Sequence, residues 1–146
     1  MTAPVFVDTN VFLYAFDAAA GSKQQAAILW LAHLWQSGRG RVSYQVLQEY
    51  YANVSQKWPA ARTPVREKIR ELLAWQPVAI DGAVIELAWK TQDRFRLSFW
   101  DSLIVAAAKA ASCRYLLTED FQPGQDLEGV LVVHPFHGRP GVLPRE

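Results

Sequence analysis

Cysteine and histidine are scarce in this chain of 146 residues, which has a single cysteine, Cys113, and three histidines. One cysteine cannot form an internal disulfide, so we expect a protein of the reducing cytoplasm. The histidines, His33, His134 and His137, show no zinc-ligand spacing with that cysteine or with one another. These shortages exclude a disulfide scaffold and argue against a zinc site.

The chain also lacks a long apolar run and an excess of one charge. No stretch approaches the roughly 20 apolar residues that cross a bilayer, and the best candidate, around Ile28 to Trp35, is interrupted by His33. The first residues lack the basic segment and cleavage site of a signal peptide, so we expect a soluble protein with no membrane partner. Fifteen Lys and Arg against fourteen Asp and Glu give a formal net charge of +1, which by itself does not indicate nucleic-acid binding.

What the chain does have is enough apolar material for one core. Its residues are 51% hydrophobic, and its length is near the commonest size of a single domain. We therefore predict one domain over residues 1–146, with an irregular tail rich in Gly and Pro from about residue 137. The tryptophans expected in the core are Trp30, Trp35, Trp75 and Trp89.

Short, continuously apolar runs alternate with amphipathic segments along the chain. Between the runs, apolar residues recur at helical spacing. This alternation is typical of a three-layer α/β fold, with a central, mainly parallel sheet of four or five strands covered by helices on both faces. The predicted strands lie at residues 5–7, 41–44, 77–80, 115–118 and 130–133.

Cap residues mark the predicted helix ends. Gly38 is a typical helix stop, and a polar loop is predicted to end another helix at residues 93–97. The start signals are two capping boxes, Ser22 with Gln25 and Ser98 with Asp101, together with Thr63 before Pro64 and Asp81 before an apolar stripe.

Acidic side chains fall at the predicted carboxyl edge of this sheet. Asp8 follows the first strand, and Glu119 and Asp120 follow the fourth. Asp101 opens the helix that leads into that fourth strand, and Glu49 lies one turn into the helix after the second. Ligands of open parallel sheets bind at this edge, where the strand order changes direction. Four separate segments are therefore predicted to bring acids to one rim.

Each acid taken alone also has a structural explanation. Asp8 is a favoured turn or cap residue after a strand, and Asp101 could complete its capping box. Glu49 lies on a polar helix side typical of a solvated face, shared with Gln45, Gln48 and Asn53. The inference of a site comes from the convergence, because neighbouring carboxylates repel one another unless a cation neutralises them. An oxygen-only ligand set suits Mg²⁺ or Mn²⁺.

Four segments carry a family pattern in order along the chain: VFVDTNV at residues 5–11, QEYY at 48–51, SFWDSLIVAAA at 98–108 and LLTEDF at 116–121. Together they resemble the motifs of PIN-domain proteins, especially the VapC-type ribonuclease toxins of type II toxin-antitoxin pairs. The second segment falls where that family carries a helical acid, and the third where an Asp enters an Ala-rich helix. The resemblance extends from Val5 to about Pro135.

The resemblance implies a set of site residues and partners. Asp8, Asp101 and Asp120 would bind Mg²⁺ or Mn²⁺, and Glu49 would complete an acidic quartet of catalytic residues. Either Glu119 or Asp120 could be the fourth acid, and the family pattern favours Asp120. Supporting groups would be Thr9, Asn10, Thr118 and Glu119. The resemblance also implies an RNA substrate, a cognate antitoxin protein and a homodimer.

We hypothesise that the protein hydrolyses RNA phosphodiester bonds, because the acids supply metal ligands and the histidines form no catalytic set. Attack by a water molecule would leave 5′-phosphate and 3′-hydroxyl ends. Two alternatives stay open. A phosphatase with Asp8 as covalent nucleophile would want a second Asp two positions on, where this chain has Asn10. A noncatalytic PIN-like module would bind RNA or protein without cutting.

Overall fold

Within residues 3–144, which the computed structural model describes, five short strands form one sheet. They are β1 (Val5–Val7), β2 (Gly40–Arg41), β3 (Tyr115–Leu117), β4 (Asp126–Leu127) and β5 (Val130–Val133), in the spatial order β2-β1-β3-β5-β4. β2, β1, β3 and β5 pair in parallel, and β4 pairs antiparallel with β5. The predicted mainly parallel sheet is confirmed.

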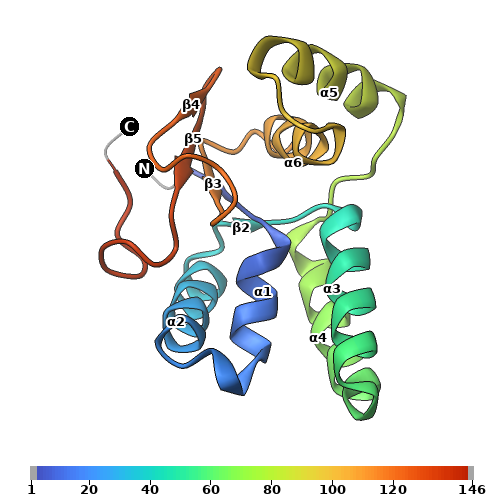
Figure 1. Cartoon of the computed structure of the whole chain (residues 1–146), viewed down its shortest axis with the longest axis vertical. Helices are drawn as coiled ribbons and strands as arrows, with labels where there is room; N and C mark the ends of the chain where they lie inside the picture. Colours follow the sequence, from blue (N-terminus) through green and yellow to red (C-terminus); the bar gives the residue numbers. More distant parts are fainter. Residues whose placement is uncertain (1–2, 145–146) are drawn as a thin grey trace.

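Helices cover both sides of this sheet. They are α1 (Thr9–Phe16), α2 (Ser22–Ser37), α3 (Tyr44–Lys57), α4 (Arg62–Leu72), α5 (Gly82–Phe95) and α6 (Phe99–Ala110). Figure 1 shows α1 to α4 on one side and α5 and α6 on the other. The three-layer prediction is therefore confirmed. Among residues 3–144, none of the helices combines the length and the apolar character that spanning a membrane requires.

The strands β1, β3 and β5 are apolar throughout, with no alternation of polar and apolar residues, because helices cover both faces of the sheet. Every residue of β1 and β3 is buried, as expected of parallel strands packed between two helical layers. The main core cluster joins these strands to residues of α1, α2, α3 and α6. A smaller cluster joins α5 to α6 and consists of Val84, Ala88, Leu103 and Ala106.

Three predicted helix ends are confirmed. Gly38 ends α2 with a φ of +71°, a left-handed conformation that glycine adopts without a Cβ clash. Asp81 caps α5 by accepting a hydrogen bond from the Val84 N–H at 3.0 Å. Ser98 caps α6 by accepting from the Asp101 N–H at 3.1 Å. This cap fixes Asp101 in the first turn of its helix.

Two predicted helix starts are wrong. α2 begins at Ser22 itself, with Gly21 in the cap position and no side-chain cap bond, because Gly21 turns the chain at a φ of +62°. α4 begins at Arg62, so Thr63 lies inside its first turn. The 3₁₀ turn Pro59–Ala61 runs directly into this helix, and the chain is already helically curved before it reaches Thr63.

The predicted strand at residues 77–80 is also wrong. There the chain forms an isolated parallel bridge between Ser43 and Val78, supported by a hydrogen bond from the Val78 N–H to the Val42 carbonyl oxygen at 3.0 Å. Ser43 is already the N-cap of α3. The strand predicted at 41–44 is therefore cut short, and no extended partner is left for residues 77–80.

Two further boundaries differ from the prediction. The loop predicted at residues 93–97 is largely helical, because α5 continues to Phe95 and ends only at Arg96, which has a φ of +55°. β4 was not predicted. It pairs with β5 through a tight turn at Gly129, whose φ of +100° requires glycine.

Two of the four tryptophans expected in the core lie at the surface. Trp30 and Trp75 are buried, whereas Trp35 and Trp89 are 48% and 52% exposed.

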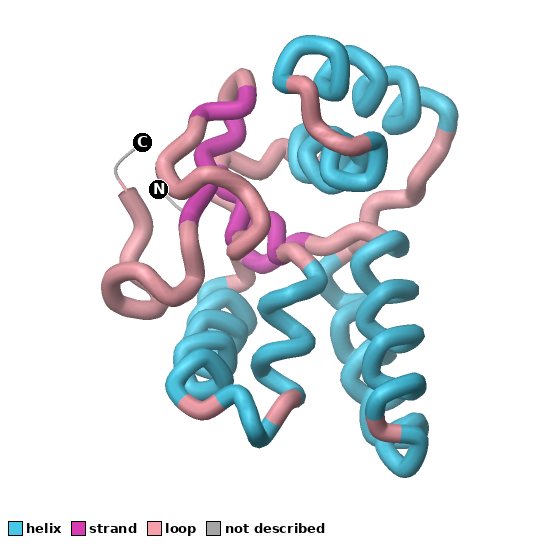
Figure 2. The backbone as a smooth tube through the Cα atoms, viewed as in Figure 1, coloured by secondary structure: helices cyan, strands magenta, loops and turns pink. Residues whose placement is uncertain are grey.

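Figure 2 draws the chain after β5 as loop as far as it is described, up to residue 144. Trp30 fixes the start of this tail by donating its indole N–H to the carbonyl oxygen of Pro135 at 3.0 Å.

We expect Gly40→Ala to destabilise the fold. A Cβ atom at Gly40 would lie 2.4 Å from the Trp75 ring, and overpacking a filled core costs about 1–3 kcal/mol. Gly82→Ala is the matched control, because nothing lies within 4 Å of a Cβ atom there and alanine favours a helix. Denaturant unfolding measures the difference, and equal free energies of unfolding for the two variants would contradict this packing.

Candidate active site

The carboxyl ends of β1 and β3 form the switch point of the sheet. β1 pairs with β2 on one side and with β3 on the other, so the chain changes direction across the sheet between them. Asp8 directly follows β1 and Thr118 directly follows β3. The Asp8 N–H donates to the carbonyl oxygen of Leu117 at 3.0 Å. The acids predicted at this edge therefore start from neighbouring backbone positions.

Asp8 is a buried carboxylate, only 5% exposed. One oxygen accepts from the Thr9 backbone N–H at 2.7 Å, and the other accepts from the Thr118 hydroxyl at 2.8 Å. Burial raises the pKa of Asp8 to about 7; the charges of Asp120 and Glu49 add to the rise, and the two hydrogen bonds oppose it. Asp8 is also the N-cap of α1. Its structural role as a helix cap is therefore compatible with a role in a site.

Thr118 links three of the predicted site residues. Its hydroxyl donates to Asp8 and accepts from the Asp120 backbone N–H at 3.0 Å and from the Asn10 amide at 3.4 Å. Thr118 is fully buried, so water does not compete for these bonds. The other amide atom of Asn10, Oδ1, is buried and has no hydrogen-bond partner among residues 3–144.

Glu49 is held by two neighbours. The Thr9 hydroxyl donates to Glu49 Oε1 at 2.6 Å, and the Gln45 amide donates to Oε2 at 3.4 Å. Gln45 is buried, so the solvated-face interpretation is wrong for this residue, although Gln48 is exposed. Gln45 was missed as a site residue; its spacing of four from Glu49 on one helix is the signal that could have found it.

Asp101 reaches the rim from the opposite helical layer. It lies partly buried in the first turn of α6. Burial raises the pKa of Asp101; a hydrogen bond with Ser98 opposes the rise, and the charges of Asp120 and Glu49 add to it. These are the same two charges that act on Asp8. The charges of Asp120 and Glu49 thus reach both Asp8, after β1, and Asp101, in the opposite helical layer.

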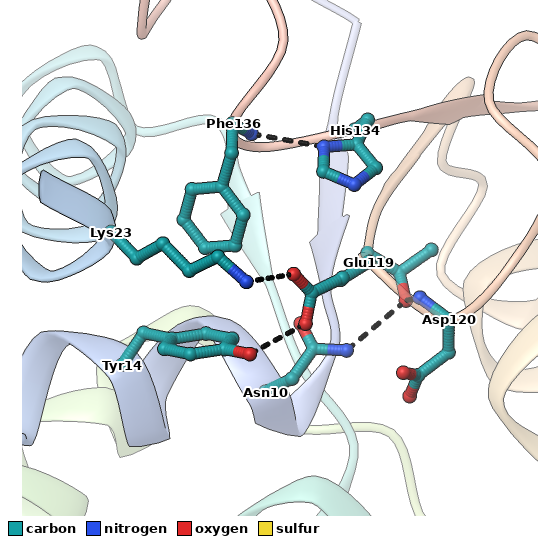
Figure 3. Close-up of polar contacts among 8 residues, drawn as sticks. Asn10, Tyr14, Lys23, Glu119, Asp120, His134 and Phe136 are labelled. Carbon is teal, nitrogen blue, oxygen red and sulfur yellow. Dashed lines mark hydrogen bonds and ion pairs between the residues drawn. The ribbon is translucent and has the colours of Figure 1, made fainter. Parts of the chain in front are cut away.

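Glu119 and Asp120 are adjacent in sequence but point in different directions (Figure 3). Glu119 accepts from the Tyr14 hydroxyl at 2.6 Å and from the Lys23 ammonium at 2.8 Å. Burial alone would raise the pKa of Glu119, but the hydrogen bonds from Lys23 and Tyr14 hold it below its ordinary value. Asp120 is exposed and is the one whose charge acts on Asp8 and on the acid of α6. The geometry therefore favours Asp120 over Glu119 at the rim.

The donor chemistry of the rim fits a hard divalent cation. The three candidate ligands, Asp8, Asp101 and Asp120, are carboxylates, the ligand type that Mg²⁺ and Mn²⁺ prefer. After burial, repulsion by the charges of Asp120 and Glu49 is a cause of the raised pKa values of Asp8 and Asp101. In the part of the chain that is described, no three His, Cys, Asp or Glu side chains come close enough to hold one ion. The carboxylates share a rim without forming a preassembled ion site.

Fold and rim together define a three-layer α/β domain with an acidic site at its switch point. The family model described as the PIN domain matches residues 5–123. This match covers most of the chain, and the chain belongs to the PIN domain family. PIN domains are generally nucleases.

The fold is shared with a solved structure. A chain of a toxin-antitoxin complex from Klebsiella pneumoniae matches with a TM-score of 0.67 and 17% sequence identity, over 90% of this chain and 98% of that chain. At this identity the likeness shows a common fold. A search of curated proteins gives no significant match.

We expect Asp8 to make the stability of the metal-free protein depend on pH. Its pKa is about 7 in the folded state and 3.8 in its unperturbed state. The folded protein therefore keeps a proton that the unfolded chain has lost, and this contribution to stability disappears as the pH rises from about 4 to 7. In a chelator, the unfolding free energy of the wild type should fall relative to that of Asp8→Asn by about 2 kcal/mol between pH 5 and pH 8.

Asp93→Asn is the control for this measurement, because Asp93 is an exposed acid on α5. It should follow the wild type at every pH. Parallel pH profiles for wild type and Asp8→Asn would show that the Asp8 carboxylate is not desolvated.

Proposed function

We propose that this PIN domain is a metal-dependent ribonuclease that hydrolyses RNA phosphodiester bonds, and that it is the toxin of a toxin-antitoxin pair. The observation that carries the proposal is the convergence of Asp8, Glu49, Asp101 and Asp120 at the switch point of the sheet. Carboxylates that repel one another are stabilised together by a cation. Family membership supports the chemistry, since PIN domains are generally nucleases.

In this proposal Asp8, Asp101 and Asp120 would hold Mg²⁺ or Mn²⁺, and Glu49 would complete the acidic set. When bound, the ion supplies positive charge that offsets the charge of the phosphate and of the reacting oxygens. An acidic rim is then compatible with an anionic substrate. A strongly basic protein surface is not needed, in keeping with the net charge of +1.

The hydrogen-bonded neighbours would give the acids separate roles. Thr9 and Thr118 hold both oxygens of Asp8 and act as positioning residues. Glu49, oriented by Thr9 and Gln45, would accept a proton from the attacking water. As the water oxygen bonds to phosphorus, the bond from phosphorus to the 3′ oxygen breaks, and that oxygen takes a proton from solvent. The ends left behind are a 5′-phosphate and a 3′-hydroxyl.

The alternatives are weaker on physical grounds. A phosphatase with Asp8 as covalent nucleophile is disfavoured, because both Asp8 oxygens are buried and already accept hydrogen bonds. Asn10 also stands where that chemistry needs a second carboxylate. A noncatalytic PIN-like module that binds RNA or protein is the other alternative, and a cleavage assay separates it from a nuclease.

A cognate antitoxin protein is the partner we propose. The likeness to a chain of a toxin-antitoxin complex supports this partner, as does an apolar groove of about 530 Å³ on the side of α1 to α4. Trp35 and Ile28, which line the groove, are each about half exposed. An amphipathic or extended antitoxin segment would cover this surface and bring a cation to the acidic rim. A homodimer and a cytoplasmic location stay predictions of the same hypothesis.

We expect the purified protein to cleave RNA with added Mg²⁺ or Mn²⁺ and to stop when the metal is chelated. Asp8→Asn and Asp101→Asn should each lower the rate by more than the roughly 10- to 100-fold that loss of an outer-shell partner costs. Thr118→Val removes such an outer-shell partner and should fall within that range. Gel analysis of cleavage rates, with mapping of the product ends, measures these effects.

Asp93→Asn is the matched control, because it removes an exposed acid whose charge is not among those that act on Asp8 or Asp101, and it should cleave like the wild type. Metal-independent cutting, or cyclic-phosphate ends, would rule out the proposed chemistry. A folded wild type that never cuts RNA with either metal would favour the noncatalytic module.

The toxin assignment has its own test. Expression of the wild type should arrest bacterial growth, because cleavage of cellular RNA stops protein synthesis, and Asp101→Asn should not. Growth should resume when the product of a small neighbouring reading frame is expressed with it. Harmless expression of a protein that cleaves RNA in vitro would count against the toxin role while leaving the nuclease intact.

A further inference from the structure

A second groove, of about 630 Å³, begins at the acidic rim and follows α1. Asn10 and Asp120 line it at the rim, and Lys57 and Trp58 line it where α3 ends. The Lys57 ammonium lies 3.5 Å from Asp17, the C-cap of α1. The groove therefore extends from the first turn of α1 to its last, about 10 Å at roughly 1.5 Å per residue.

The walls of this groove carry the groups that bind single-stranded nucleic acid. Aromatic rings come from Tyr14 and Trp58, and neutral amides come from Asn53 and Gln56. A cation, Lys57, stands beside Asp17 at the end away from the rim, and Glu119 lines the groove next to Asp120. Proteins that bind single strands combine aromatic rings, on which bases stack, with cations that contact phosphates.

The Trp58 ring is only partly buried. Phe16 supports the indole, with ring centroids 5.7 Å apart. The Lys57 ammonium lies 4.8 Å above the same ring, and this side chain is 64% exposed. The cation that lies over this ring is therefore flexible and solvated. A base can take that place when the cation turns to a phosphate.

The ion pair of Lys57 does not prevent this exchange. Its partner Asp17 is 3.5 Å away and partly buried, but the Lys57 side chain is 64% exposed, so the pair is worth little in free energy. A phosphate offers the same ammonium a stronger charge-assisted contact. Next to the rim, by contrast, the acids repel phosphate. The distribution of charge therefore favours a strand whose flanking phosphate lies at Lys57.

On the basis of the nuclease function proposed above, we propose that this groove binds the single-stranded RNA next to the scissile phosphate, with a base on Trp58 and a phosphate at Lys57. Its volume lies within the roughly 300–1,000 Å³ of small-ligand sites, which suits an unpaired nucleotide. Duplex RNA keeps its bases stacked on one another and offers no free base face to an aromatic ring. The nuclease would therefore select unpaired segments of its substrate.

The test measures binding separately from cleavage. The Asp8→Asn protein in chelator is titrated into a short, fluorescein-labelled single-stranded RNA of mixed sequence, and anisotropy gives the Kd. Adding Trp58→Leu should weaken binding by about fivefold or more, through loss of a base stack. Adding Lys57→Met should weaken it too and lower the slope of log Kd against log salt by about 0.7, for one phosphate contact. The matching duplex should compete poorly.

Matched controls are Trp89→Leu and Lys90→Met, which remove an exposed tryptophan and an exposed lysine from α5 on the other side of the sheet (Figure 1). They should bind RNA like the parent. Lys57 is itself exposed, so Lys57→Met keeps the test valid if Trp58→Leu disturbs folding, which circular dichroism monitors.

The outcomes separate this subsite from the nuclease function. Folded groove variants that bind like the controls overturn the subsite even where the wild type cleaves RNA. Equal affinity for duplex and single-stranded RNA overturns the preference for unpaired RNA. A folded protein that binds no RNA overturns the subsite itself. Binding that depends on Trp58 and Lys57, in a protein that never cuts with Mn²⁺, supports the subsite and refutes the nuclease.

Discussion

The hydrogen bond from the Thr118 hydroxyl to the Asp8 carboxylate joins two strand ends that are 110 residues apart in sequence. It forms because β1 and β3 pair in the register that puts Val7 beside Leu117. The same hydroxyl accepts from the backbone of Asp120, so one buried threonine orients one acid and fixes the loop that carries another. A shift of this register by one residue would separate Asp8 from Thr118 and from the loop that carries Asp120.

The acids of the rim fall into a fixed pair and a freer pair. Thr9 donates its backbone N–H to Asp8 and its hydroxyl to Glu49, so a single residue couples the acid that follows β1 to the acid of α3. Asp101 is only partly buried and Asp120 is exposed, so their side chains retain more freedom. This difference explains how the charges of Glu49 and Asp120 can add to the effect of burial on the pKa of Asp8 and of Asp101 without the acids already forming a closed ligand cage.

Local chemistry was enough to predict most of the fold, because apolar runs and caps such as Ser98 act over a few residues. It failed where a partner far away in sequence decides the outcome. Residues 77–80 have the composition of a strand but little to pair with. The direction of Glu119 is decided by Lys23, 96 residues away. Helical spacing showed that Trp35 belongs to an apolar face, but it could not show that the face stays half open.

The two edges of the sheet are unusually short. β4 contributes two residues, and β2 contributes two more, with the Ser43–Val78 bridge lying against its continuation. Exposed edges of greater length invite pairing with strands of other molecules, and proteins avoid this by shortening or covering them. Copies of this chain are therefore poorly suited to join through a continuous intermolecular sheet. Any assembly they form would have to be built from side chains on helix surfaces.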